Sequence, residues 1–196
     1  GGYDEENGSS ADRPDKKGAD IEMKPFKNIA VIGLGNMGGG IAACLAKKGY
    51  SLFVYDRSPE KRAAFLDSAQ PCESAEEAVR AGGAILLSLP NSEIVEATLR
   101  ALPDGAAAGK IFLDLSTSFP LSTKALAEEL AQKGAFLLDA PLLAGPDEAK
   151  AGTLTAMIGG DRTAFDRVSP LLADFCEKFD YVGASGNAHT MKIMMN

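Results

Sequence analysis

Short apolar runs alternate with longer amphipathic stretches along the chain from residue 26 onward. The apolar runs are rich in Val, Ile, Leu and Phe and are nearly continuous, which is typical of strands buried on both faces. They predict strands at residues 28–32, 51–55, 84–89, 110–115, 135–139 and 153–158, with a weaker one near Tyr181. The stretches between them have helical spacing and predict helices at residues 37–48, 59–68, 74–81, 92–102, 122–133 and 162–178.

Several of these predicted helices have recognisable ends. Ser74 followed by Glu77 is a capping box, and Ser92 marks a second helix start. Gly49 and Gly134 are placed to end the helices before them. Strand–helix–strand units join by right-handed crossovers, which give a parallel sheet with helices on both faces. The sequence therefore predicts an α/β fold with a doubly wound, mainly parallel sheet.

A glycine-rich turn joins the first predicted strand to the first predicted helix: Gly33-Leu34-Gly35-Asn36-Met37-Gly38. Gly33 allows the tight turn, Gly35 lets a pyrophosphate approach the backbone, and Gly38 lets the helix lie close to the sheet. The start of the helix offers free N–H groups to the phosphates. We therefore predict a Rossmann domain in which residues 33–38 bind a dinucleotide.

The second predicted strand is followed by Asp56, 21 residues after Gly35. A carboxylate at this place bonds the adenosine ribose hydroxyls and disfavours a 2′-phosphate, which favours NAD. Arg57 and Ser58 would attract a 2′-phosphate, which favours NADP. We expect NAD as the cofactor, with NADP as the alternative.

Residues 187–196 contain no Gly or Pro and predict a helix that carries His189, Lys192 and Asn196. Their i, i+3 and i+7 spacing places the three side chains within about 60° of one another on one helix face. The Lys192 amine could exchange a proton with a substrate oxygen, and Asn196 could orient the substrate. The alternatives are a solvated lysine on an amphipathic helix and, for His189, a polar residue at a helix start.

Composition indicates an ordinary globular chain, with 45% hydrophobic and 24% charged residues. Residues 1–22 hold seven acidic and three basic side chains, a net charge of -4, so the other 174 residues carry only -3 of the total of -7. This first segment has too few large apolar groups to fold, and we expect a disordered tail or linker. No basic stripe is present, which disfavours nucleic acid as a partner.

Three widely spaced cysteines, Cys44, Cys72 and Cys176, form no disulfide or metal-binding pattern. We therefore expect no metal and a reducing, cytoplasmic environment. No apolar run is long enough to span a membrane, and no signal peptide is recognisable in the sequence.

Several segments together resemble the β-hydroxyacid dehydrogenase family (3-hydroxyisobutyrate dehydrogenase and its relatives, with 6-phosphogluconate dehydrogenase more distant). The segments are IAVIGLGNMGGGIAACLAKKGY at 29–50, VYDRSPEK at 54–61, LSLPNSEIVEATL at 87–99, FLDLSTSFP at 112–120, LLDAPLLAGPDEAKAGTLTAMIGG at 137–160 and GNAHTMKIMMN at 186–196. They occur in the family's order and spacing over residues 25–196.

The resemblance implies a Rossmann domain at residues 23–184 and the start of an interdomain helix at 185–196, before an all-α dimerising domain. It implies cofactor contacts at Gly33, Gly35, Gly38 and Asp56, nicotinamide-side positions at Leu89, Pro90 and Thr117, a catalytic Lys192 and a substrate-side Asn196. A small-molecule substrate and, through the all-α domain, a homo-oligomer are therefore expected. We expect residues 1–196 alone to bind cofactor without turnover.

One segment departs from the family pattern. The family's DAPVSGG, whose serine and glycines hold the substrate carboxylate, corresponds here to residues 139–145, with Leu143, Ala144 and Gly145 at its end. A leucine cannot donate a hydrogen bond, so we expect a less polar substrate group there, or an anchor such as Ser116 or Ser118.

The function hypotheses that remain belong to three classes. The first is an NAD(P)-dependent dehydrogenase or reductase acting on a small 3-hydroxyacid or aldehyde acid, with Lys192 as acid and base. The second is a cofactor-binding module that senses or scaffolds without turnover. The third is a Rossmann-type methyltransferase or flavoprotein, which Lys192 together with Asn196 disfavours.

Overall fold

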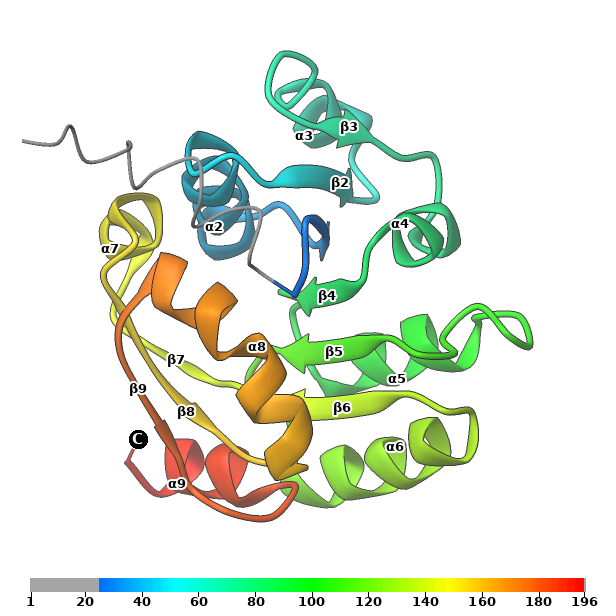
Figure 1. Ribbon diagram of the computed structural model, residues 1–196, viewed down its shortest axis with the longest axis vertical. Coiled ribbons are helices and arrows are strands. Elements are labelled where there is room, and N and C mark those ends of the chain that lie inside the picture. The colour runs from blue at the N-terminus through cyan, green and yellow to red at the C-terminus, as the bar shows by residue number, and fades with distance from the viewer. Residues whose placement is uncertain (1–24, 196) are drawn as a thin grey trace, which may run out of the picture.

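A six-stranded parallel sheet forms the centre of the computed structural model, which describes residues 25–195 (Figure 1). The order is β3-β2-β1-β4-β5-β6. The strands are β1 (Asn28–Ile32), β2 (Ser51–Tyr55), β3 (Gln70–Pro71), β4 (Ala84–Leu87), β5 (Ile111–Asp114) and β6 (Phe136–Asp139). This order is that of the Rossmann fold, which confirms the predicted fold class. The predicted tail at 1–22 and Asn196 lie outside the described residues.

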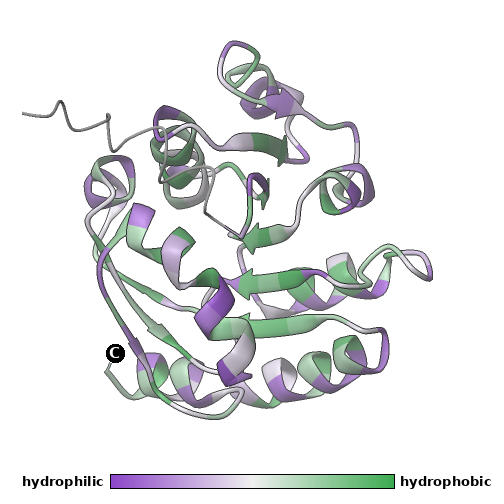
Figure 2. Ribbon diagram, in the orientation of Figure 1, coloured by the Kyte–Doolittle hydropathy of each residue, from purple (hydrophilic) through white to green (hydrophobic). Residues whose placement is uncertain are grey.

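The central strands are buried on both faces because helices cover each side. Ile29 and Val31 of β1 face α2 (Asn36–Lys47) and α8 (Arg162–Phe175), while Ala30 and Ile32 face the opposite side. That opposite side is covered by α4 (Ala75–Ala81), α5 (Ser92–Arg100) and α6 (Pro120–Gln132). Strands β1, β4, β5 and β6 are accordingly apolar along most of their length, whereas the helices have both polar and apolar residues (Figure 2).

A second, three-stranded sheet lies beside β6 and contains the strand that the sequence predicts at residues 153–158, which is therefore not part of the main sheet. It contains β7 (Leu142–Leu143), β8 (Leu154–Ile158) and β9 (Cys176–Tyr181), in the order β7-β8-β9. β7 and β8 are antiparallel and are joined by α7 (Pro146–Ala151), whereas β8 and β9 are parallel. A strand joins a parallel sheet through a crossover connection that places it parallel to its neighbour. β8 instead pairs antiparallel with β7, and it therefore lies in the second sheet.

The prediction of a helix through residue 178 is wrong at its end. α8 stops at Phe175, and the next six residues form β9, which pairs with β8 and includes the strand predicted near Tyr181. The end of α8 is determined by main-chain pairing of the following residues with β8, which is distant in the sequence. The helical spacing of apolar residues does not indicate such pairing. The predicted helix 59–68 is likewise shorter, because α3 spans only Pro59–Ala63.

The helix starts agree only in part with the predictions. Ser74 caps α4 by accepting a hydrogen bond from the Glu77 N–H, but the Glu77 carboxylate accepts from the N–H of Glu73 rather than of Ser74. α5 is capped by Asn91, whose Oδ1 accepts from the Ile94 N–H. Ser92, the predicted start, is buried, and its hydroxyl accepts from the Phe119 N–H at the start of α6.

The three cysteines are buried and free. Burial raises the pKa of the Cys72 thiol to about 11 and that of Cys176 to about 12. None of the helices within residues 25–195 is long and apolar enough to cross a membrane.

Candidate active site

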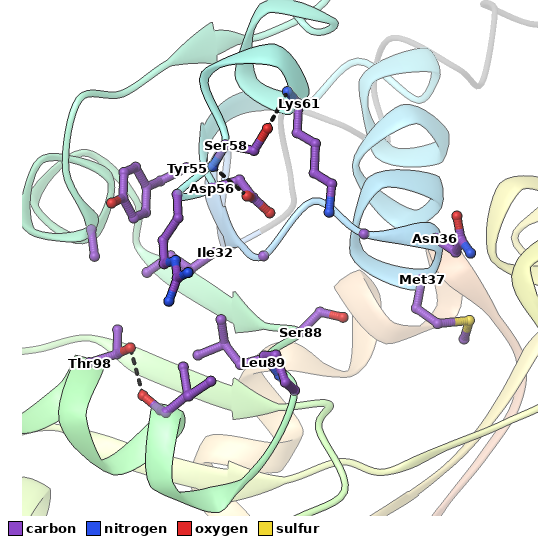
Figure 3. Close-up of a pocket in the computed structure, with 16 residues that line it drawn as sticks. Ile32, Asn36, Met37, Tyr55, Asp56, Ser58, Lys61, Ser88, Leu89 and Thr98 are labelled. Carbon is purple, nitrogen blue, oxygen red and sulfur yellow. Dashed lines mark hydrogen bonds between the residues drawn. The ribbon is translucent and has the colours of Figure 1, made fainter.

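A cavity of about 820 Å³ opens at the carboxyl ends of β1, β2 and β4 (Figure 3). Its size is that of a small-molecule site. It lies where the chain order of the sheet reverses between β1 and β4, which is where open α/β sheets bind their ligands. Among the predicted cofactor residues, its lining includes Gly33, Gly35, Asn36, Met37, Asp56, Arg57, Leu89 and Pro90.

The three glycines of the turn have the spatial roles that the sequence predicts for them. Gly33 has a φ of +98°, and a Cβ there would lie 2.0 Å from the Ser88 carbonyl oxygen. A Cβ on Gly38 would lie 2.0 Å from the carbonyl oxygen of Gly33. A Cβ on Gly35, by contrast, would meet nothing within 4 Å. The backbone at Gly35 is therefore open to a ligand, while Gly33 and Gly38 let the turn pack against β4.

The Asp56 carboxylate stabilises this turn through hydrogen bonds. One carboxylate oxygen accepts a hydrogen bond from the Leu34 N–H at 2.8 Å, and the other accepts from the Ser58 N–H at 2.8 Å. Each oxygen keeps a further lone pair for a hydroxyl group. The start of α2 follows directly, and its N-cap Gly35 supplies no side-chain hydrogen bond. The first N–H groups of α2 therefore lack an intrahelical partner and are suited to a phosphate.

Three further side chains around Asp56 can recognise the adenosine half of a dinucleotide: Arg57, Ser58 and Lys61. Lys61 extends from α3 into the space between α3 and α2 (Figure 3). It also lines a second cavity together with the predicted residue Leu34. Sequence reasoning missed Lys61. The signal was its place in the first turn of the short helix that Ser58 caps, five residues after Asp56.

The predicted nicotinamide-side residues are not all in one place. Leu89 and Pro90 line the large cavity, whereas Thr117 is exposed and does not. The Leu89 N–H donates to the Ser116 hydroxyl at 2.9 Å, which ties the ends of β4 and β5 together.

Lys192 lies beside the segment that departs from the family pattern. It belongs to α9 (Asn187–Met195), and its Nζ donates to the carbonyl oxygen of Leu142 at 3.0 Å. The next residues are Leu143, Ala144 and Gly145, so the structure brings the predicted acid–base residue to the predicted substrate segment. Ala144 has a φ of 102°, and within residues 25–195 no other residue except glycine has a positive φ. The second predicted catalytic residue, Asn196, lies outside the described residues.

The hydroxyls of Ser116 and Ser118 have internal partners. Ser116 accepts from Leu89 as described, and Ser118 donates to a carboxylate oxygen of Asp114 at 2.6 Å. Both serines are buried. Burial raises the pKa of the Asp114 carboxyl, while His189 and the two serines act in the opposite direction. These hydroxyls serve a buried network, and their contacts give no support to a role in holding a substrate carboxylate.

His189 belongs to the same network and is fully buried. Its ring lies between the Ser116 carbonyl and the Thr123 hydroxyl, with the Asp114 carboxylate 4.0 Å away. The prediction of a polar residue at a helix start is right about its position in α9 but missed these contacts. Asp114 and Asp139, which each end an apolar strand, were the sequence signal for a polar network at this edge.

No group of three or more His, Cys, Asp or Glu side chains within residues 25–195 is arranged to hold a metal ion.

The sequence matches, over residues 28–183, the family described as the NAD binding domain of 6-phosphogluconate dehydrogenase. The chain belongs to this family. Its cofactor is therefore a nicotinamide adenine dinucleotide, and the open backbone at Gly35 with the Asp56 carboxylate beside it fits such a molecule.

Curated relatives and solved structures include 3-hydroxyacid dehydrogenases, as the resemblance implied. The chain is 35% identical to 2-(hydroxymethyl)glutarate dehydrogenase of Eubacterium barkeri over 89% of its own length and 59% of that protein. It is 36% identical to 3-hydroxyisobutyrate dehydrogenase of Pseudomonas aeruginosa, over 86% of this chain and 58% of that protein. The structure of Mycobacterium tuberculosis 3-hydroxyisobutyrate dehydrogenase with L-serine has a TM-score of 0.82 and 29% identity, covering 87% of this chain and 59% of that one. The chain thus spans less than two thirds of each.

Gly33→Ala should destabilise the domain far more than a glycine substitution that only strains the backbone. Gly105 is the matched control, because its φ is also positive, at +83°, but a Cβ there would meet nothing within 4 Å. We expect Gly105→Ala to lower the free energy of unfolding by about 1–2 kcal/mol, and Gly33→Ala by at least about 2 kcal/mol more. Urea denaturation measures both, and equal losses would contradict the close contact with Ser88.

Proposed function

We propose that the protein containing this chain is an NAD(P)-dependent dehydrogenase or reductase of small 3-hydroxyacids or the corresponding aldehyde acids. The observation that carries the proposal is the contact between Lys192 and Leu142, because it joins an amine to the segment that the family uses for substrate. A cofactor-binding module without turnover is the second candidate, and the observation in its favour is Leu143 at the family's serine position.

The chemistry divides between the cofactor and the chain. When bound, the nicotinamide exchanges a hydride with the carbon that bears the substrate oxygen. The Lys192 amine takes the hydroxyl proton as the carbonyl forms, and the protonated amine returns it in the reverse direction. The Leu142 carbonyl orients the amine, since it accepts one of its hydrogens. Leu89 and Pro90 form a wall of the cofactor cavity.

The substrate class follows from what the relatives are named for. 2-(Hydroxymethyl)glutarate, 3-hydroxyisobutyrate and L-serine, named for three relatives, each carry a hydroxymethyl group and a carboxylate on one carbon. They differ only in the third substituent. Leu143 and Ala144 add apolar surface at the segment beside Lys192, and Ala144 is exposed. We therefore propose a substrate with an apolar third substituent or a less charged group in place of the carboxylate.

The 196-residue chain should bind NADH more tightly than NADPH, because Asp56 accepts ribose hydroxyls and repels a 2′-phosphate. Asp56→Ala also disturbs the turn through Leu34, so the informative quantity is the ratio of the two affinities. We expect the ratio to shift toward NADPH by about tenfold. Lys61→Ala should shift it the other way, and Asp67→Ala, an exposed carboxylate in the turn after α3, is the control. Calorimetry that finds tighter NADPH binding by the wild-type chain would refute the NAD assignment.

In the complete natural protein that contains this chain, Lys192→Ala should lower kcat by roughly 10²–10⁴, the range for a general acid–base group. Cofactor affinity should stay the same, because Lys192 does not line the cofactor cavity. The control is Lys150→Ala, which removes an exposed amine of α7. Steady-state turnover of short 3-hydroxyacids tests this, and a wild-type kcat in the Lys192 variant would remove that residue from the mechanism.

The complete protein should turn over 3-hydroxyisobutyrate and 2-hydroxy-3-oxopropionate poorly and prefer more apolar hydroxyacids. Leu143→Ser with Ala144→Gly should raise kcat/KM on these short polar acids by about tenfold, because the substrate carboxylate gains a hydrogen-bond donor. Ala144→Gly alone is the control for relief of backbone strain. High kcat/KM of the wild type on the polar acids would show that their carboxylate is held elsewhere.

A further inference from the structure

The helix that carries Lys192 has no capping side chain of its own. The Thr190 N–H donates to the Gly186 carbonyl at 2.9 Å, which makes Gly186 the N-cap of α9. A glycine offers no side-chain acceptor, and the residue at the N3 position is His189. A helix start without a cap leaves its first N–H groups unpaired, which is costly when they are buried.

Asp139, at the end of β6, supplies the missing cap from outside the helix. One carboxylate oxygen accepts from the Gly186 N–H at 3.0 Å, and the other accepts from the His189 N–H at 3.0 Å. These are the N-cap and N3 donors that a capping box satisfies with the helix's own side chains. A Cβ on Gly159 would lie 2.7 and 2.8 Å from the two oxygens, so the carboxylate is closely enclosed. The negative charge also lies at the positive end of the α9 dipole.

The His189 ring fixes the rotation of α9 about its axis. A carbonyl oxygen only accepts, so Nε2 carries a proton and donates to the Ser116 carbonyl at 2.9 Å. In the neutral ring, Nδ1 then accepts from the Thr123 hydroxyl of α6 at 2.7 Å. Lys192 follows three residues later, on the same face of the helix. A rotation that broke the ring contacts would therefore also move the lysine amine away from Leu142.

The same network reaches the cofactor cavity. Ser116 accepts from the His189 ring with its carbonyl and from the Leu89 N–H with its hydroxyl. Leu89 lines the cavity. Two hydrogen bonds to one buried residue therefore connect the wall of the cofactor cavity to the helix of the proposed acid–base group.

We propose that Asp139 and His189 are positioning residues, which fix the start and the rotation of α9 and so hold the Lys192 amine at the Leu142 carbonyl. This inference rests on the proposed function, because it gives Lys192 its importance. The positional effect itself concerns the ground-state structure and needs no substrate.

The test measures the reactivity of individual lysines in the folded 196-residue chain. Limited acetylation followed by peptide mass spectrometry gives the labelling rate of Lys192 relative to the exposed Lys61 and Lys150. Asp139→Asn replaces one carboxylate oxygen by an NH2 group, which cannot accept a hydrogen bond from the backbone N–H that it faces. His189→Leu removes both hydrogen bonds of the ring. We expect each to raise the relative rate at Lys192 by about threefold or more, as for the loss of one hydrogen bond.

Two conservative comparisons separate positioning from general destabilisation. His189→Gln keeps an N–H that can reach the Ser116 carbonyl, so its Lys192 rate should return toward that of the wild type. Asp161→Asn alters the carboxylate that caps α8 through the Ala164 N–H, and it should leave Lys192 unchanged. Thermal unfolding followed by circular dichroism verifies that each variant is folded.

The proposal is overturned if Lys192 is labelled as fast as Lys61 in the wild type, or if its rate does not change in folded Asp139→Asn and His189→Leu. Where His189→Leu does not fold, Thr123→Val removes the Nδ1 partner alone and carries the same expectation. Because labelling involves no turnover, a failure here is distinct from a failure of the proposed function, which the kcat of Lys192→Ala decides.

Discussion

The close approach of the first turn to the end of β4 is the contact on which the cofactor site depends. Gly33 and Gly38 leave no room for a Cβ on the side of Ser88, and Gly35 leaves its own side open. Because the turn packs closely against the end of β4, the first N–H groups of α2 lie at the cavity. Asp56 then holds the turn from the β2 side through the Leu34 N–H. The two strands that flank β1 in the sheet thus fix one short stretch of backbone.

The sequence was informative wherever local pattern decides structure. The six apolar runs that form β1, β2, β4, β5, β6 and β8 were predicted correctly, as was the glycine turn. Buried strands and tight turns are encoded within a few residues. The strand near Tyr181 was predicted, but its start was assigned to the preceding helix, because residues 176–178 become part of a strand only by pairing with β8, more than twenty residues earlier. The separate β7-β8-β9 sheet was missed for the same reason, since its pairing is tertiary.

The candidate site divides in a similar way. Residues on the glycine turn were predictable because each has a local steric role. Lys61, Asp139 and His189 were not, because their roles depend on neighbours brought together by the fold. Capping motifs in a sequence identify a helix start by an acceptor side chain within the first residues of the helix. The acceptor at the start of α9 is Asp139 of β6, so no such motif indicates it. The available signal was that two apolar strands end in Asp. This signal indicates the edge of the sheet at which polar groups gather, but it does not identify the helix that they contact.

The substrate segment shows that backbone shape and side-chain chemistry can change separately. Ala144 holds a φ of 102°, which glycine adopts freely and alanine only at a cost of roughly 1–3 kcal/mol. The strain persists because β7 pairs with β8 on one side and α7 begins at Pro146 on the other. The backbone shape is therefore imposed by its surroundings, and with it the Leu142 carbonyl stays at Lys192. Leu143 has no hydroxyl group, so under the proposed function its side chain offers no hydrogen-bond donor to a substrate carboxylate.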